Sequence, residues 1–312
     1  MDALNIGIDV SKDALDVAAN GPAFAPFRVA RTADGLADLI ERVKPLGAAR
    51  IAVEATGGFE TVVAASLAAA GLPVVVVNPA QVRAFAQAMG KRMKTDPIDA
   101  FVIARFAEAT RPEIRPLPDA ELQALADLVA RRRQIVAMIG AESQRLKRAS
   151  PRTARSIERL LEALKRELAD IDQEIGGAVR RTPAWLEKAE LLKSVPGIGD
   201  QIARTLLAEM PELGDLDRRQ IAALAGLAPW TRQSGQWRGR SFIGGGREAI
   251  RKALFMGAQV AAQHNPILKA FRDRLVAAGK PKMVAIIAVA RKLLTILNAI
   301  IREKQPWRAE AA

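Results

Sequence analysis

The first 110 residues combine short extended runs with helix-like segments in an order that strongly limits the folds open to them. Three extended runs come first, LNIGIDV, ALDVAAN and FAPFRVAR, with gaps short enough for an antiparallel meander. They are followed by a predicted helix (34–43), a strand (50–54), a helix after the Thr56-Gly57-Gly58 turn, a buried strand at LPVVVVN, and helices from Ala80 and from Asp96. The pattern predicts an α/β domain built on one sheet.

Three strands followed by alternating helix and strand is the order of an RNase H-like sheet. In such a sheet the strand that ends at Asp9 and the strand that ends at Glu54 are neighbours. Sites in open α/β sheets gather at strand ends, so both carboxylates are candidate site residues. Asp13 and Asp16 are nearby acids, but their predicted places on the following turn and second strand make them weaker candidates.

The segment KRMKTDPIDAF places Asp96 and Asp99 three residues apart at the start of an apolar helix. One interpretation is structural: Thr95 or Asp96 caps the helix, and the acid at Asp99 favours its dipole. The other is chemical, because residues three apart share a helix face and both carboxylates could bind one metal site.

Each of these acids has a structural explanation by itself, but together they favour a metal site. If the last helix of the domain packs against the strand ends, Asp96 and Asp99 converge with Asp9 and Glu54. Four carboxylates in one place repel one another, which is costly without cations. Two Mg²⁺ ions about 3.5–4 Å apart would neutralise the cluster and activate phosphodiester chemistry.

From Asp119 to about Gly177 apolar residues keep helical spacing in two runs, separated at Ser150-Pro151. This pattern predicts a helical hairpin or coiled coil, used for spacing or dimerisation. Two ordinary helices of a bundle explain it equally well, since the heptads run only briefly.

From about Pro183 the chain is predicted to be mainly helical. Within this part, LLKSVPGIGDQIARTLLAEM (191–210) is similar to a helix-hairpin-helix element, in which Gly197 and Gly199 let backbone N–H groups approach a phosphate. The alternative is a plain packing unit of two helices joined by a turn.

The formal net charge of +13 indicates a polyanionic partner. The charge is concentrated toward one end, because residues 1–110 carry −1, residues 111–190 carry +3 and residues 191–312 carry +11. Nucleic acid is therefore the predicted partner of the last third, and an anionic membrane surface is the weaker rival because no strongly basic amphipathic anchor stands out. Apolar runs such as VAIIAVA are too short to span a membrane, and no signal-peptide pattern opens the chain, which favours a cytoplasmic protein.

Several kinds of site are excluded by residue types that are missing or scarce. The chain has no cysteine, which excludes disulfides and cysteine-ligated zinc or iron–sulfur centres. The single histidine, His264, is predicted in a turn and leaves little on which to build a histidine metal cluster or a serine–histidine triad.

Residues 226–251 combine arginines, tryptophans and glycines around a serine. Five arginines could clamp phosphates with two hydrogen bonds each, namely Arg232, Arg238, Arg240, Arg247 and Arg251. Trp230 and Trp237 offer stacking surfaces, although either could belong to a core. Ser234, among these cations, suits attack on a phosphate because they stabilise both the alkoxide and the transition-state charge. In the alternative, Ser234 only hydrogen-bonds a phosphate within a binding loop.

Nearly the whole chain resembles a DEDD transposase of the IS110 family of insertion sequences, the bridge-RNA-guided recombinases. The RuvC-like N-terminal pattern matches in GIDVSKDALDVA, VEATGGFE and KTDPIDAFVIARFA, and the C-terminal transposase pattern matches in VPGIG, GLAPWTRQSG and RGR. The resemblance implies that the four acids, Asp9, Glu54, Asp96 and Asp99, hold the metal. It also implies that Ser234 is the nucleophile of a composite site; Ser241 is the next serine to test.

The resemblance also implies the domain plan, the reaction and the partners. The expected parts are a RuvC-like domain (1–112), a helical hairpin or coiled coil (113–182) and a C-terminal transposase domain (183–312). The implied reaction is Mg²⁺-dependent cleavage and exchange of DNA strands through a phosphoserine, guided by a noncoding RNA, in a homodimer or homotetramer. Two rivals stay open: a RuvC-type junction resolvase or nuclease that uses metal-activated water, and a non-catalytic nucleic-acid-binding protein.

Overall fold

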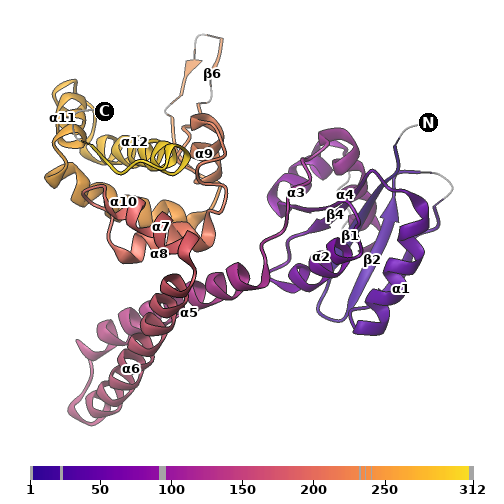
Figure 1. Cartoon of the computed structure of the whole chain (residues 1–312), viewed down its shortest axis with the longest axis horizontal. Helices are drawn as coiled ribbons and strands as arrows, with labels where there is room; N and C mark the ends of the chain where they lie inside the picture. Colours follow the sequence, from indigo (N-terminus) through magenta and orange to yellow (C-terminus); the bar gives the residue numbers. More distant parts are fainter. Residues whose placement is uncertain are drawn as a thin grey trace. The chain divides into compact units, whose positions relative to one another are not determined.

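The computed structural model describes residues 3–21, 24–90, 96–231, 233–235, 237–239 and 241–308, except for the side chains of residues 96–98, 237 and 238. The chain divides into two compact units, Met1–Leu117 and Pro118–Ala312 (Figure 1). Each unit has its own hydrophobic core.

The first unit is built on a mixed sheet. Its described strands follow the order β3-β2-β1-β4-β5, with β1, β2 and β3 antiparallel and β1, β4 and β5 parallel. The strands are β1 (Asn5–Val10), β2 (Ala14–Ala19), β3 (Phe27–Ala30), β4 (Arg50–Glu54) and β5 (Val74–Val77). This arrangement confirms the predicted meander followed by alternating helix and strand, and it is compatible with an RNase H-like domain.

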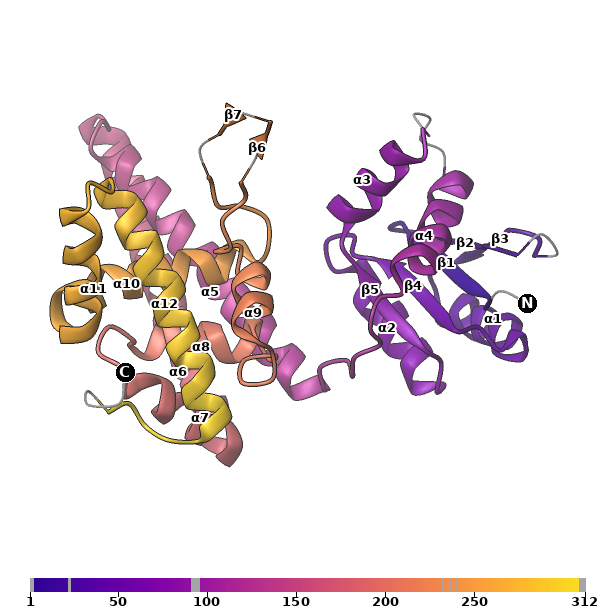
Figure 2. The same ribbon diagram turned by 90° about the horizontal axis from the view of Figure 1, so that it is seen from above.

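Helices cover both faces of this sheet (Figure 2). One face packs against α1 (Ala33–Val43), which a short 3₁₀ turn (Lys44–Leu46) follows, and against α2 (Phe59–Ala69). The other face packs against α3 (Pro79–Ala88) and α4 (Asp96–Thr110). Successive side chains of a strand point to opposite faces of the sheet, so each strand contributes side chains to both helix layers.

The prediction of a fully buried strand at LPVVVVN is wrong in one respect. Val74, Val75 and Val77 are buried, but Val76 is 39% exposed. Val76 is exposed because β5 lies at the edge of the sheet and has a neighbouring strand on one side only.

The second unit begins with a long helical hairpin. Its helices are α5 (Ala120–Leu146) and α6 (Pro151–Arg181), which run side by side (Figure 1). The break at Ser150-Pro151 is confirmed as the turn. The open end of the hairpin shares a core with the helices that follow, since Leu125, Ile135 and Ile175 belong to the same buried cluster as those helices.

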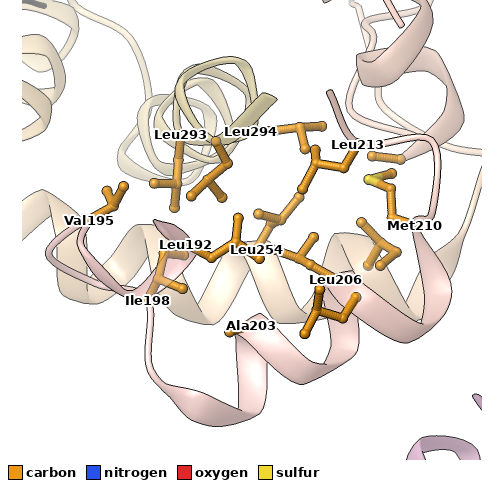
Figure 3. Close-up of a cluster of buried hydrophobic side chains, with 14 of the residues drawn as sticks. Leu192, Val195, Ile198, Ala203, Leu206, Met210, Leu213, Leu254, Leu293 and Leu294 are labelled. Atoms are coloured by element: carbon orange, nitrogen blue, oxygen red, sulfur yellow. The ribbon is translucent and has the colours of Figure 1, made fainter. Parts of the chain in front are cut away.

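The rest of the second unit is mainly helical, as expected. Its elements are α7 (Pro183–Lys193), α8 (Asp200–Glu209), α9 (Arg218–Leu224), the short strands β6 (Gln233–Ser234) and β7 (Trp237–Arg238), α10 (Glu248–His264), α11 (Pro266–Ala277) and α12 (Lys282–Glu303). Figure 3 shows the centre of the core, where Leu192 of α7, Leu206 of α8 and Leu254 of α10 meet Leu293 and Leu294 of α12.

Helix α12 is long and apolar enough to cross a membrane by length and composition alone. It is longer than the apolar run after Lys282 because Arg291 and Lys292 interrupt the run without ending the helix. Val289 and Leu297 are fully buried against the other helices of the unit. Packing in the core therefore accounts for the apolar character of α12.

Candidate active site

Acidic side chains lie in one row across the sheet of the first unit. The β1–β4 register ends with Ile8 opposite Val53, so Asp9 and Glu54, one residue further in each strand, are neighbours. On the other side of β1, Asp9 lies directly opposite Asp16 of β2. Adjacent strands are about 4.8 Å apart, so three carboxylates start from backbone positions within about 10 Å.

Asp16 is more central to this row than its sequence context indicates. It is buried, and its carboxylate lies 3.8 Å from the guanidinium of Arg28, its register partner on β3. Asp13, in contrast, is an exposed residue of the bend between β1 and β2, as predicted. Of the two additional acids, Asp16 is therefore the stronger candidate site residue, because it faces the same layer as Asp9.

Helix α4 covers the face of the sheet that carries the row. Gly7 of β1 lies directly under it, since a Cβ added there would come 2.1 Å from the carbonyl oxygen of Ala100 and 2.4 Å from the backbone nitrogen of Ala104. Asp9, two residues beyond Gly7, points to the same face. Ala52, two residues before Glu54, belongs to the cluster that packs against α4, so Glu54 points to this face as well.

The direction of α4 brings its first turn to the carboxyl ends of β1 and β4. The Nε of Arg50, at the start of β4, donates a 3.0 Å hydrogen bond to the carbonyl of Pro112, just after the end of α4. The helix therefore runs antiparallel to these strands. The first turn of α4, which contains Asp96 and Asp99, therefore lies at the edge of the sheet at which Asp9 and Glu54 lie.

The donor set at this edge is chemically suited to a hard cation. Carboxylate oxygens are the protein ligands that Mg²⁺ prefers. The side chain of Asp96 lies outside the described residues, and among the side chains that are described no group of three or more acids or histidines is close enough to hold a metal ion. The ligand roles of Asp9, Glu54, Asp96 and Asp99 stay a prediction.

The loop that follows Glu54 is shaped by an acid that the sequence patterns do not single out. Gly57 and Gly58 have positive φ, and Glu60 folds back so that its Oε2 accepts hydrogen bonds from the backbone N–H groups of Thr56 (2.9 Å) and Gly58 (2.8 Å). These bonds hold the turn between β4 and α2 and so fix the end of the strand at Glu54.

In the second unit, Ser234 belongs to β6, which lies in a protruding hairpin (Figures 1 and 2). We call residues 230–242 the serine arm; residues 232, 236 and 240 lie outside the described part of it. Ser234 is exposed and pairs with Trp237 across the turn, in which Gly235 has a φ of 55°. The base of the arm is closed by backbone hydrogen bonds between Trp230 and Phe242 (2.7 and 3.1 Å).

The two candidate serines have different surroundings in the arm. The hydroxyl of Ser241 lies 2.9 Å from that of Thr231, with which it shares a hydrogen bond near the base. Ser234 is next to the turn, at the other end of the arm. Trp230 is 59% exposed and so is not a core residue.

Glycines below the serine arm permit close contact between two segments of the protein. A Cβ added at Gly246, where φ is 59°, would lie 2.4 Å from the backbone nitrogen of Gly226. The Nη1 of Arg251 donates to the carbonyl of Gly245 (2.5 Å). The close approach of Gly246 to Gly226, just after α9, anchors the serine arm to the end of that helix.

Arg247 also has a partner within the protein. Its guanidinium forms two hydrogen bonds of 2.6 Å with the carboxylate of Glu212, and a third of 2.9 Å with the carbonyl of Glu209. Phosphate contacts by Arg247 and Arg251 stay predictions. Arg232 and Arg240 lie outside the described residues, as does the side chain of Arg238.

The helix-hairpin-helix-like segment is confirmed as two helices, α7 and α8, joined by a glycine turn. Gly197 packs against α10, because a Cβ there would lie 2.6 Å from the Cβ of Ala261, whereas a Cβ at Gly199 would meet nothing within 4 Å. A 3.0 Å hydrogen bond from Lys193 lowers the pKa of the Asp200 carboxyl at the start of α8. Phosphate binding at Gly197 and Gly199 stays a prediction, and Gly199 is the more accessible of the two.

Two family models match the chain, and together they cover the candidate residues of both units. The IS110-type DEDD transposase model, described as a transposase, matches residues 6–153, which include Asp9, Glu54, Asp96 and Asp99. The model of the transposase IS116/IS110/IS902 family matches residues 189–273, which include Ser234.

Individual relatives give the same assignment. The chain is 32% identical over 263 residues to the pilin gene-inverting protein of Moraxella bovis, covering 82% of the chain and 80% of that relative. The corresponding protein of Moraxella lacunata matches to the same extent. An uncharacterised 43.6 kDa protein of the insertion element IS110 from Streptomyces coelicolor is 30% identical over 115 residues, covering 36% of the chain and 28% of that protein.

The acids of the first unit and Ser234 of the second unit thus both fall within matched segments, and more than two thirds of the chain aligns with a relative above 30% identity. The chain belongs to the IS110 family of transposases.

Proposed function

We propose that this transposase cuts and rejoins DNA strands through a covalent phosphoserine at Ser234, with a divalent metal held by Asp9, Glu54, Asp96 and Asp99. The observation that supports the acid half best is the row formed by Asp16, Asp9 and Glu54 under the first turn of α4. The exposed position of Ser234 near the tip of the serine arm supports the other half. The name of the Moraxella relatives, pilin gene-inverting protein, fits a reaction that rejoins DNA as well as cutting it.

The chemical step is a transesterification. The Oγ of Ser234 loses its proton and forms a bond to a DNA phosphorus, and the bond from that phosphorus to the 3′-oxygen of the deoxyribose breaks. The 3′-oxygen takes up a proton and leaves as a free hydroxyl. Because the phosphodiester energy is kept in the serine ester, attack by the 3′-hydroxyl of another strand rejoins DNA without ATP. Bound Mg²⁺ would supply charge neutralisation and polarise the phosphate oxygens.

Ser234 is preferred to Ser241 as the nucleophile because of where the two hydroxyl groups lie. A nucleophile must reach the phosphate of a bulky duplex, which an exposed residue next to the turn can do. The hydroxyl of Ser241 already shares a hydrogen bond with Thr231 near the base of the arm. The cationic surroundings of residues 191–312, with a net charge of +11, support binding of the DNA backbone close to the arm.

Target choice by a noncoding RNA from the element, and assembly as a homodimer or homotetramer, complete the proposal. The phosphate part of binding is independent of sequence, so the basic last third would serve RNA and DNA equally well. Strand exchange requires several strands to be cut in concert, which supports more than one copy of the chain in the active complex.

A recombination assay tests the proposal. Cells receive the protein, a plasmid with the element ends and their flanking noncoding region, and a target plasmid, and junctions are counted by amplification across them. Asp9→Asn and Ser234→Ala should abolish junctions, Ser241→Ala should keep them, and deletion of the noncoding region should abolish them with the protein intact. Junctions formed by Ser234→Ala would refute the assigned nucleophile.

A further inference from the structure

The α5–α6 hairpin has a strongly basic tip that neither the acid row nor the serine arm uses. Residues 145–159 contain six lysines and arginines and a single acid, Glu158, a net charge of +5. The cations are Arg145, Lys147, Arg148, Arg152, Arg155 and Arg159. The rest of the hairpin is balanced, since residues 119–144 and 160–181 each carry a net charge of −1.

Among the residues that the structure describes, one of these six cations is used in an ion pair. Arg145 pairs with Glu142 in the preceding turn of α5. In the part of the chain that the structure describes, the other five form no salt bridge, and all five are exposed. Nearer the core the pattern is the opposite, because Arg132 is bonded to Asp172 and Arg133 to Glu209.

On α6 the arginines form one stripe. Arg152, Arg155 and Arg159 are spaced by three and four residues, so they share a face of the helix over about 10 Å of its length. The apolar residues that pack against α5, such as Leu161 and Leu164, lie on the opposite face. Further along the same outward stripe the charges alternate, with Glu162, Arg166 and Asp170.

Helix stability does not account for this placement. The N-terminal end of a helix carries the positive end of the macrodipole and favours acids, yet the first turn of α6 contains none and Arg152 is its second residue. Ser150, at the N-cap, makes no side-chain cap hydrogen bond. Both features leave the tip electropositive and favour an anion.

The tip also extends well beyond the core. Ile139 is the last residue of α5 that packs against the core, and the helix continues for seven residues to Leu146, about 10 Å. Figure 1 shows the turn of the hairpin away from the other helices of the unit. A surface of this kind can reach along the backbone of a duplex, which presents about one negative charge per 1.7 Å.

We propose that the tip of the α5–α6 hairpin, residues 145–159, binds the phosphate backbone of double-stranded DNA and forms a contact separate from the serine arm. The proposal rests on family membership and on the charges of the tip, and it is independent of the roles of the acids and of Ser234. Duplex DNA is chosen over RNA because DNA is the substrate of a transposase.

The test compares two variants that remove the same charge from the same helix. Arg155→Gln/Arg159→Gln removes two tip cations, and Lys165→Gln/Arg166→Gln removes two exposed cations where acids balance them. Glutamine keeps helix propensity, and circular dichroism checks that α6 is retained. Binding of the full-length protein to a labelled DNA duplex is measured with EDTA present, so that no cleavage occurs, at salt concentrations from about 50 to 200 mM.

Loss of two phosphate contacts should make the slope of log K against log salt shallower by about 1.8 for the tip variant and leave the slope of the control unchanged. Over this range the wild type should then lose about tenfold more affinity than the tip variant. Arg155→Lys/Arg159→Lys should restore the wild-type slope, and Lys147→Gln/Arg148→Gln, in the turn outside both helices, should reproduce the loss.

Three outcomes would overturn the proposal. Equal slopes for the tip variant and the control would mean that DNA binding depends on the net charge of the protein and not on the position of the tip cations. A loss confined to a structured RNA probe would assign the tip to RNA. A change in oligomeric state by sedimentation, with the DNA slope unaltered, would make the tip a protein interface.

Discussion

Asp9 of β1 lies directly opposite Asp16 of β2, so that two carboxylates from neighbouring strands face the same layer under α4. Asp16 is buried and close to Arg28, whereas Asp9 has Glu54 on its other side. If Asp9 holds a metal ion, as we propose, Asp16 is in a position to modulate the affinity for that ion.

We predict that Asp16→Asn raises the Mg²⁺ concentration needed for half-maximal strand cleavage by about 10–100-fold, since groups beside metal ligands have effects of this size. Titration of cleavage against Mg²⁺ measures it. Asp13→Asn is the matched control, because Asp13 carries the same charge but is an exposed residue of the bend between β1 and β2. An unchanged Mg²⁺ requirement in Asp16→Asn with a lowered melting temperature would give Asp16 a structural role only.

Gly7 of β1 lies where the backbone of α4 comes very close to the sheet. Gly7→Ala would place a Cβ 2.1 Å from the Ala100 carbonyl oxygen, so α4 must shift. We expect a loss of about 1–3 kcal/mol in the free energy of unfolding of the first unit, and a loss of cleavage.

Gly140→Ala is its control, because Gly140 lies within α5 and a Cβ there meets nothing within 4 Å. That change should stabilise the protein by about 0.5–1 kcal/mol or leave it unaltered. Denaturant unfolding of both variants measures the difference, and equal stabilities would show that α4 does not depend on the contact at Gly7.

Much of the first unit follows from its sequence, because the periods of its apolar residues are local. The meander, the helix from 34 to 43 and the strand at 50–54 are all confirmed. The row of acids depends on register between strands, which the apolar pattern alone does not set. The length and type of the turn between β1 and β2 set this register, which places Asp9 opposite Asp16.

The candidate site is less predictable where long-range packing decides. The glycines near the serine arm are conspicuous in sequence, but only the fold shows that Gly246 approaches Gly226 and that Gly197 approaches Ala261. An arginine in sequence likewise does not reveal its partner. In sequence, Arg247 cannot be distinguished from the arginines of the hairpin tip. Only the fold shows that Arg247 is hydrogen-bonded to Glu212.

The Arg247–Glu212 pair supports a third prediction. Glu212→Gln should lower the stability of the second unit by about 1–3 kcal/mol, because the half-buried guanidinium loses its two charge-assisted hydrogen bonds. Arg247→Lys should also destabilise it, since lysine cannot bind a carboxylate with two bonds. Thermal melts measure both, and unchanged melting temperatures would leave Arg247 available to a phosphate.

Asp172, at the root of the hairpin, supports a prediction about pH. Burial alone would raise the pKa of its carboxyl, but hydrogen bonds from Arg132 and Gln201 and the charges of Arg132 and Arg204 outweigh burial and lower the pKa. A lowered folded-state pKa gives stability that is present above the unfolded value of about 3.9 and is lost as the pH falls through the folded value.

Asp172→Asn should therefore melt at a lower temperature than the wild type at pH 7, and the difference should narrow as the pH falls below about 4. Melting temperatures of both proteins from neutral to acid pH test this. A difference that stays constant with pH would mean that the charge of Asp172 does not contribute to the docking of the hairpin.

A denaturing gel shows whether a covalent bond forms between Ser234 and DNA. The protein is incubated with Mg²⁺, labelled element-end DNA and the flanking noncoding RNA, and the products are separated under denaturing conditions. We predict a labelled band at the mass of the protein, present with Ser241→Ala and absent with Ser234→Ala. Cut DNA without such a band would contradict it and would indicate attack by metal-activated water.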